Sequence, residues 1–408
     1  MSDLINLLAD ATPDIAQLRD RRPDATENAQ ASFRALLEPA EPGDFPQAWR
    51  YAVAAFVSGV SGAGRAHEFY RELLAEEGDD GEAEALAAAV DEAVERGVST
   101  GPYASGGFVT FGTSDTDSAG IPARLAAGLD FAHLLTFHPA DASPAAIGHL
   151  QEVGWSDDAI VSLAQLISFL AFQLRVVHGV AVVGGSAAAP REVQRADGVP
   201  DPGWAPGPRT LTPDVVAPET FVAHSLGWKP WLQALPKGEF TDRHRDALIQ
   251  PQRIDSEYFR LLARDPDALK ARTLTDLDIF YNTDGGLGRA ERELAATVVS
   301  RFNGCTYCAS VHQARSKDEG GDAAAIDRLL DEGIAADLGS PAWSAIRDAA
   351  VALTSTPTRF GAEHVDALRA AGLDDLAVLD VVNASAFFNW ANRLMLTLGE
   401  PDVPRRFR

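Results

Sequence analysis

The chain has 408 residues, more than a single domain usually contains, which favours two domains. Its 59 acidic and 35 basic residues give a net charge of −24 with no basic cluster beyond Arg405 and Arg406, so we expect no nucleic-acid partner and no anionic membrane partner. The first twenty residues include acidic side chains and no apolar segment, unlike a secretory signal, so we expect a cytoplasmic protein.

Abundant alanine and helical spacing of apolar residues predict an all-α protein. In the first part of the chain we expect helices near 47–60, 64–76, 84–96, 121–136, 143–152 and 157–180. The last is interrupted by polar residues, which indicates a buried helix rather than a membrane span. Helices are then expected near 256–264, 289–301, 305–317, 322–332, 342–354, 362–371 and 374–398.

A segment rich in proline and glycine separates these two series and predicts an irregular linker at 184–215. The expected domains are therefore 1–183 and 216–408. The two flanking sequences repeat each other with a constant spacing of 218 residues, as the following pairs show: Pro139 and Pro357, Gly154 and Gly372, Phe169 and Phe387, Arg175 and Arg393.

The repeat continues upstream, where the run from Arg50 is similar to the run from Arg292. Aligning His67 with His312 gives a spacing of 245 residues, so the first half has about 27 extra residues, most of them in an expected loop at 101–120. In that alignment Val60 and Ala63 stand where the second half has cysteines, which predicts a degenerate first domain.

The only two cysteines of the chain, Cys305 and Cys308, are followed by His312. Offsets of three, four and seven residues lie on one face of a helix, an arrangement suited to a dithiol that cycles between reduced and oxidised states. Asn303 and Gly304 are expected to end the preceding helix, and Asn303 to cap the next one. Cys305 would then lie in a first turn, where the helix dipole favours a thiolate.

This motif supplies what reduction of a peroxide requires: a thiolate, a proton for the leaving oxygen and a second thiol. The run around it strongly resembles the cysteine-containing branch of the alkylhydroperoxidase D and carboxymuconolactone decarboxylase superfamily. The resemblance implies that Cys308 is the peroxidatic thiol, that Cys305 is the resolving thiol, and that Glu293 and His312 relay the proton through a water. Where the best-studied branch has a histidine before the second cysteine, this chain has Tyr307.

The resemblance thus predicts two tandem alkylhydroperoxidase D-like domains and a peroxidase acting on hydrogen peroxide or an organic hydroperoxide. Such a peroxidase requires an external dithiol reductant and no bound cofactor. Single-domain relatives are oligomers of paired domains, so we expect a homo-oligomer, with a trimer favoured. Two other functions stay open: a lactone enzyme of the carboxymuconolactone decarboxylase type, and a redox sensor or disulfide oxidoreductase.

Alternatives also exist for individual residues. The cysteines could be buried small side chains, or could bind zinc together with His312 and a carboxylate. Glu293 could be a solvated helix charge, as Glu291 and Arg292 are expected to be. Structural roles are expected for the remaining polar or aromatic residues that stand out: His67, Asn389, Asn392, Arg393, Trp228 and Trp231.

Overall fold

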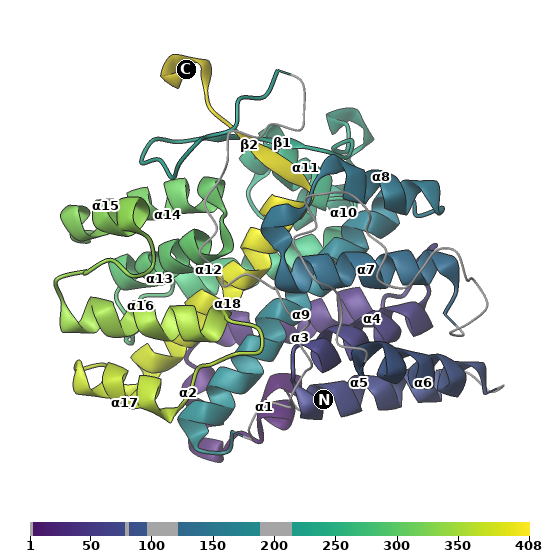
Figure 1. The fold of residues 1–408 in the computed structure, drawn as a ribbon, viewed down its shortest axis with the longest axis horizontal. Helices are drawn as coiled ribbons and strands as arrows, with labels where there is room; N and C mark the ends of the chain where they lie inside the picture. Colours follow the sequence, from purple (N-terminus) through teal and green to yellow (C-terminus); the bar gives the residue numbers. More distant parts are fainter. Residues whose placement is uncertain (1–2, 78–80, 96–120, 188–213) are drawn as a thin grey trace.

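The computed structural model describes residues 3–77, 81–95, 121–187 and 214–408. Eighteen α-helices fill these ranges, so the prediction of an all-α fold is confirmed (Figure 1). The expected loop at 101–120 lies outside the described residues, as does most of the expected linker. One two-stranded antiparallel sheet, which the sequence did not predict, pairs β1 (Gly227–Pro230) with β2 (Gly399–Asp402).

Seven helices of the first half recur in the second half in the same order. The first series is α3 (Pro23–Leu37), α4 (Gln47–Val60), α5 (Gly64–Glu76), α6 (Glu82–Glu95), α7 (Ala123–Phe137), α8 (Pro144–Glu152) and α9 (Asp157–Gly184). The second is α12 (Pro266–Tyr281), α13 (Arg289–Asn303), α14 (Thr306–Asp318), α15 (Ala323–Glu332), α16 (Pro341–Thr354), α17 (Ala362–Ala370) and α18 (Asp375–Thr397).

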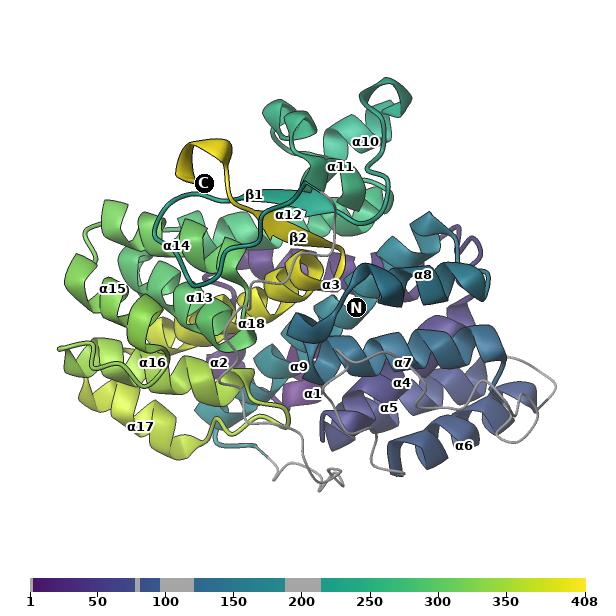
Figure 2. The same ribbon diagram turned by 45° about the horizontal axis from the view of Figure 1, so that its top comes forward.

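Four further helices lie outside the two series: α1 (Leu4–Ala9), α2 (Pro13–Arg19), α10 (Asp242–Ala247) and α11 (Glu257–Leu262). Figure 2 shows α10 and α11 beside the small sheet, at one end of the molecule. Helices α1, α2, α3, α10 and α12 were not predicted from the sequence, whereas α4 and α5 lie at their predicted bounds.

Helices α9 and α18 cross at the centre of the molecule and pack along each other (Figure 1). Trp390 of α18 is fully buried there; its ring centroid lies 5.3 Å from that of Phe169 and 5.6 Å from that of Phe172. Its indole N–H donates to Gln165 Oε1 at 3.2 Å, so the polar edge of the ring is also satisfied. By length and composition α9 is apolar enough to cross a membrane, but 83% of its most apolar window is buried inside the fold.

The two halves exchange equivalent hydrogen bonds across this centre. Arg175 of α9 donates to the Thr354 carbonyl at 2.8 Å, and Arg393 of α18 donates to the Thr136 carbonyl at 3.0 Å. The two arginines are 218 residues apart and so are the two threonines. Each half therefore completes the backbone hydrogen bonding of the other at the end of α7 or α16.

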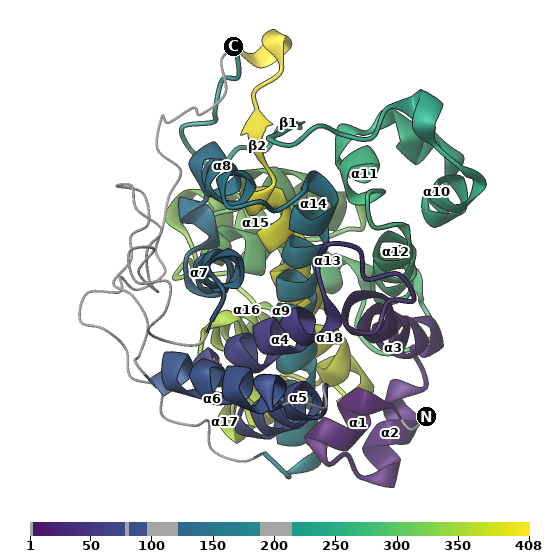
Figure 3. The same cartoon turned by 90° about the vertical axis from the view of Figure 1, so that its right-hand side faces the viewer.

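A second pair of equivalent helices, α3 and α12, also packs side by side, as Figure 3 shows. At the start of α3, Arg22 reaches the second half and forms an ion pair with Asp380 of α18 at 2.7 Å, with both side chains 2% exposed. Arg292 contacts the same carboxylate at 3.1 Å. Arg292 is thus buried and paired, and the expectation that it would be a solvated helix charge is wrong.

The helix pairs α4–α5 and α13–α14 correspond at a spacing of 242 residues, not the 245 expected from the histidines. Gly62 and Gly304, which separate the two helices of each pair, have φ angles of 75° and 77°. The Ser58 and Ser300 hydroxyls donate to the carbonyls four residues earlier at the same distance, 2.7 Å. The turn glycine fixes this register because few other residues adopt a positive φ.

In the corrected register, Ala63 and Ala66 stand where the second half has Cys305 and Cys308, and Tyr70 stands at the position of His312. His67 is buried, with a hydrogen bond of 2.8 Å between its Nδ1 and the Ala55 carbonyl and with Nε2 3.2 Å from Asp91. It has the structural role that the sequence analysis expected.

Candidate functional site

The thiol motif lies at the junction between α13 and α14. Gly304 adopts a left-handed conformation that ends α13, and the Cys305 N–H then donates to the Ser300 carbonyl at 2.9 Å. Cys305 occupies the N-cap position of α14, and Cys308 lies in its first turn. Asn303 is the last residue of α13 and its amide donates to Asn392 at 3.1 Å, so the expectation that Asn303 caps α14 is wrong.

Both cysteines are free thiols and both are buried, Cys305 at 1% exposure and Cys308 at 5%. Burial raises the pKa of Cys305 well above its ordinary value, and its hydrogen bond with Cys308 and the negative charge of a Cys308 thiolate add to the effect. The expectation that the helix start would favour a thiolate at Cys305 is therefore wrong, because loss of hydration outweighs the helix dipole. A thiolate at Cys308 would hold the proton on Cys305.

Glu293 is fully buried on α13 and contacts His312 of α14 through Oε2 and Nδ1. Its other oxygen, Oε1, accepts from Arg289 Nε at 2.7 Å. Burial by itself would raise the pKa of Glu293, but the charges and hydrogen bonds of His312 and Arg289 outweigh it and lower the pKa below its ordinary value. Glu293 is thus an ionised, paired carboxylate, and the alternative of a solvated helix charge is wrong.

Aromatic rings hold the His312 imidazole in place. The Phe388 ring stands edge-on to it with centroids 4.2 Å apart, and the Phe280 centroid lies 6.0 Å away. With Nδ1 bonded to Glu293 on one side, the ring orientation of His312 is fixed. Among the described residues no hydrogen bond joins His312 directly to Cys308, so a proton passing between them needs a bridging water or substrate.

Two tyrosines lie within electrostatic reach of the thiols. Burial raises the pKa of Tyr307, and the negative charges of Cys308 and Cys305 add to this. Burial likewise raises the pKa of Tyr258; Arg272 opposes the shift and Cys308 adds to it. The Tyr258 hydroxyl is buried without a hydrogen-bond partner among the described residues. The raised pKa values keep both phenols protonated.

Arg289, Phe280, Phe388 and Tyr258 were not found from the sequence. Arg289 stands four residues before Glu293, the spacing of a helical ion pair, and that signal was present in the sequence. The other three belong to α12, α18 and α11, distant in sequence from the motif, and no local pattern connects them with it.

Asn389 and Asn392 of α18 form hydrogen bonds to other helices, which is a structural role. Asn389 donates to the Thr354 hydroxyl at 3.1 Å, and Asn392 donates to the Ser300 hydroxyl at 3.1 Å.

The two tryptophans anchor the small sheet: Trp228 Nε1 donates to the Met395 carbonyl at 2.9 Å, and Trp231 Nε1 donates to Glu400 at 3.1 Å. These contacts agree with the structural roles expected for them.

In the part of the chain that the structure describes, no three His, Cys, Asp or Glu side chains are grouped so that they could hold a metal ion. The zinc alternative therefore has no ligand set there. What the arrangement offers instead is a buried dithiol beside a chain of three interacting side chains, His312, Glu293 and Arg289.

Comparison with known proteins gives one family. The model of the carboxymuconolactone decarboxylase family matches residues 266–352, which span α12 to α16 and include both cysteines, Glu293 and His312. No curated protein matches the chain.

Proposed function

We propose that the chain is a thiol-dependent peroxidase. The match of residues 266–352 to the carboxymuconolactone decarboxylase family, which includes enzymes, supports the superfamily expected from the sequence. The observation that carries the proposal is the pairing of a buried dithiol, Cys305 and Cys308, with His312 and an ionised Glu293 on neighbouring helices.

In the proposed reaction, the Cys308 thiolate attacks the O–O bond of hydrogen peroxide or an organic hydroperoxide. The distal oxygen becomes bonded to sulfur as a sulfenic acid, and the leaving oxygen takes a proton and departs as water or alcohol. Cys305 then attacks the Cys308 sulfenic acid, which releases water and forms the Cys305–Cys308 disulfide. An external dithiol reduces this disulfide and is itself oxidised, which restores both thiols.

The charges around the motif support this division of roles. The high pKa of Cys305 keeps its thiol protonated while Cys308 reacts, so that a proton is present for the sulfenic oxygen that leaves in the second step. Glu293 fixes the orientation of His312 through Nδ1, and the imidazole can then pass a proton to the leaving oxygen through a water or the peroxide itself.

Two other functions use parts of the same site. A lactone enzyme of the carboxymuconolactone decarboxylase type would need the imidazole and carboxylate but not two thiols. A redox sensor or disulfide oxidoreductase would use the dithiol without peroxide turnover.

One experiment separates these functions. The reduced full chain is treated with one equivalent of hydrogen peroxide, then examined by thiol titration and by mass spectrometry of the digested protein. The proposal expects an intramolecular Cys305–Cys308 disulfide within seconds, and repeated turnover when a dithiol reductant is added. Thiols that stay reduced would contradict it, and a single oxidation without turnover would favour the sensor.

A further inference from the structure

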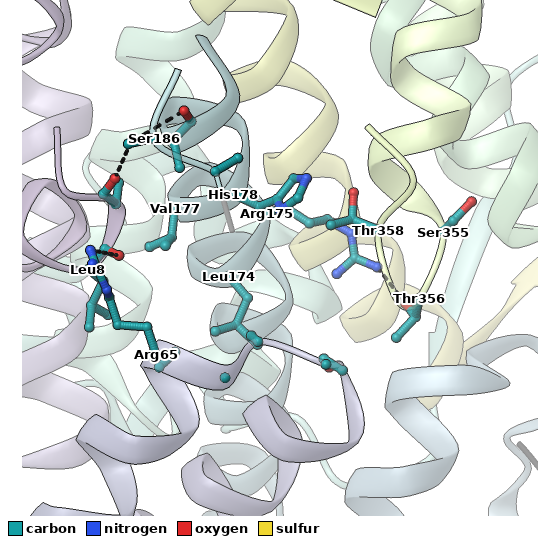
Figure 4. Close-up of a pocket in the computed structure, with 18 residues that line it drawn as sticks. Leu8, Arg65, Leu174, Arg175, Val177, His178, Ser186, Ser355, Thr356 and Thr358 are labelled. Atoms are coloured by element: carbon teal, nitrogen blue, oxygen red, sulfur yellow. Dashed lines mark hydrogen bonds between the residues drawn. The ribbon is translucent and has the colours of Figure 1, made fainter. Parts of the chain in front are cut away.

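A cavity of about 140 Å³ lies in the first half, between the start of α5, the second part of α9 and the loop after α16. Figure 4 shows Leu174, Arg175, Val177 and His178 of α9 facing it. Residues 61–66 form another wall. In the corrected register these residues are the counterpart of 303–308, so the cavity occupies, in the half without cysteines, the place of the thiol site.

The sequence difference between the halves explains why this place is open. Ala63 and Ala66 replace Cys305 and Cys308, and Leu174 stands where the second half has Asn392. The smaller alanines leave space at the start of α5, and the amide network that Asn303 and Asn392 form in the second half has no equivalent there.

The polar groups of the cavity favour negative charge. Arg175 is 6% exposed; two of its nitrogens are hydrogen-bonded, whereas Nε has no partner among the described residues. Burial, and then the charge of Arg393, lowers the pKa of Arg175 well below its ordinary value, and among the described residues no carboxylate lines the cavity to offset this. The Thr356 hydroxyl accepts from Arg175 at 2.8 Å (Figure 4).

The start of α5 adds a second source of positive potential. Its N-cap residue, Ala63, provides no side-chain acceptor, and helix geometry leaves the N–H groups of Gly64, Arg65 and Ala66 without intrahelical partners. All three residues line the cavity. The Arg65 side chain is 57% exposed; its Nη1 donates to the Leu8 carbonyl at 3.3 Å, and its Nη2 lies 3.8 Å from the Asp10 carboxylate. This weak surface pair leaves other N–H groups of the guanidinium for a ligand.

The apolar part of the lining is formed chiefly by Leu8, Leu174, Val177, Ala66 and Ala181. The His178 imidazole and four hydroxyl groups, those of Ser61, Ser186, Ser355 and Thr358, add polar groups to the lining. An apolar cavity of about this volume accommodates a benzene ring. A doubly charged phosphate would lose too much hydration among these side chains, whereas a carboxylate with a compact apolar body meets both parts of the lining. We propose that this cavity is a binding site for a small aromatic or alicyclic carboxylate, separate from the thiol site.

Calorimetric titration of the full chain tests the proposal with three probes: benzoate, its neutral analogue benzamide, and inorganic phosphate. Benzoate should bind about tenfold or more tightly than benzamide, since hydrogen bonds to a charged group are the stronger ones. Phosphate should bind more weakly than benzoate. No heat with benzoate, or equal affinity for benzamide, would overturn the proposal.

Variants locate the site. Ala66→Leu fills the cavity and should abolish benzoate binding, while Ala75→Leu, farther along the same helix, should leave it unchanged; thermal unfolding shows that both variants are folded. Arg65→Gln, at an exposed position, should weaken benzoate binding about two- to fivefold without affecting benzamide, the range of a partly solvated ion pair. Arg71→Gln on the same helix is the matched control.

The proposal is independent of the proposed peroxidase activity. A variant with both Cys305→Ser and Cys308→Ser should bind benzoate like the wild type. Loss of binding in that variant would place the ligand at the thiol site and overturn the proposal, as would unchanged binding in Ala66→Leu.

Discussion

Replacing Glu293 by glutamine removes one buried negative charge and changes the shape of the side chain little. In the wild type this carboxylate is fully buried and faces His312 and Arg289. Glutamine keeps an acceptor for Arg289 but removes the negative charge that faces the His312 imidazole. If His312 donates the proton to the leaving oxygen, oxidation of Cys308 should slow by roughly 10²–10⁴, the usual contribution of general acid–base assistance.

The same substitution changes stability in a way that depends on pH. His312 and Arg289 lower the pKa of Glu293 despite its burial. The ionised carboxylate therefore stabilises the fold at pH values above 4.5, the ordinary pKa of a glutamate. This contribution is lost as the pH falls below that value and through the lower pKa of the folded state. At neutral pH we expect Glu293→Gln to lower the free energy of unfolding by about 1–3 kcal/mol. The loss is limited because the glutamine oxygen still offers one hydrogen-bond acceptor to Arg289 and His312.

Stopped-flow measurement gives the rate of thiol oxidation, and urea unfolding at neutral and acidic pH gives the change in the free energy of unfolding. Glu291→Gln is the matched control: it is on the same helix, and its carboxylate accepts from Trp343 Nε1 at 3.3 Å, away from the thiols. An oxidation rate for Glu293→Gln within about twofold of the wild type would refute the relay, because general acid–base assistance is far larger. A stability difference that stayed constant as the pH fell would refute the assignment of an ionised Glu293.

Cys308→Ser should abolish peroxide consumption, whereas Cys305→Ser should leave a sulfenic acid at Cys308 that dimedone traps and mass spectrometry locates. Gly304→Ala should cost about 1–2 kcal/mol in urea unfolding, because alanine is strained at a φ of 77°. Asp380→Ala should cost about 3–5 kcal/mol in the same assay, since it leaves two buried guanidinium groups unpaired. Residues 215–408 expressed alone should be poorly soluble or assemble differently by light scattering, because the fragment exposes the face of α18 that packs on α9; the full chain should be a symmetric oligomer, a trimer being favoured.

A specific outcome would contradict each of these predictions. Sulfenic acid trapped at Cys305 in the Cys308→Ser variant would reverse the thiol roles. Gly148→Ala, in helix α8 with open space around the added methyl group, should not destabilise the protein, and an equal loss in both glycine variants would show that the turn at Gly304 is unimportant. An Asp380→Ala variant as stable as the wild type would show that the buried pairs contribute nothing. A monomeric full chain with a stable, active fragment would contradict the predicted assembly.

The sequence alone determined the local helical pattern. Helices α4 and α5 were predicted at their observed bounds, and Asn303 and Gly304 marked the end of α13, because capping and periodicity depend on neighbouring residues. It also placed Cys305, Cys308 and His312 in one continuous motif, to which the family resemblance added Glu293. The catalytic roles of these four residues stay predictions. The division into domains at 183 and 216, and the trimer, stay predictions.

The tertiary structure decided what depends on contacts between distant segments. Burial, not helix position, sets the high pKa of Cys305, and desolvation cannot be read from a local run of residues. The register of the first half was wrong by three residues because two histidines were aligned, whereas the positive φ of Gly62 and Gly304 fixes the turn that both halves share. The exchanged bonds of Arg175 and Arg393 form only when α9 and α18 cross, since each needs a carbonyl that the other half supplies.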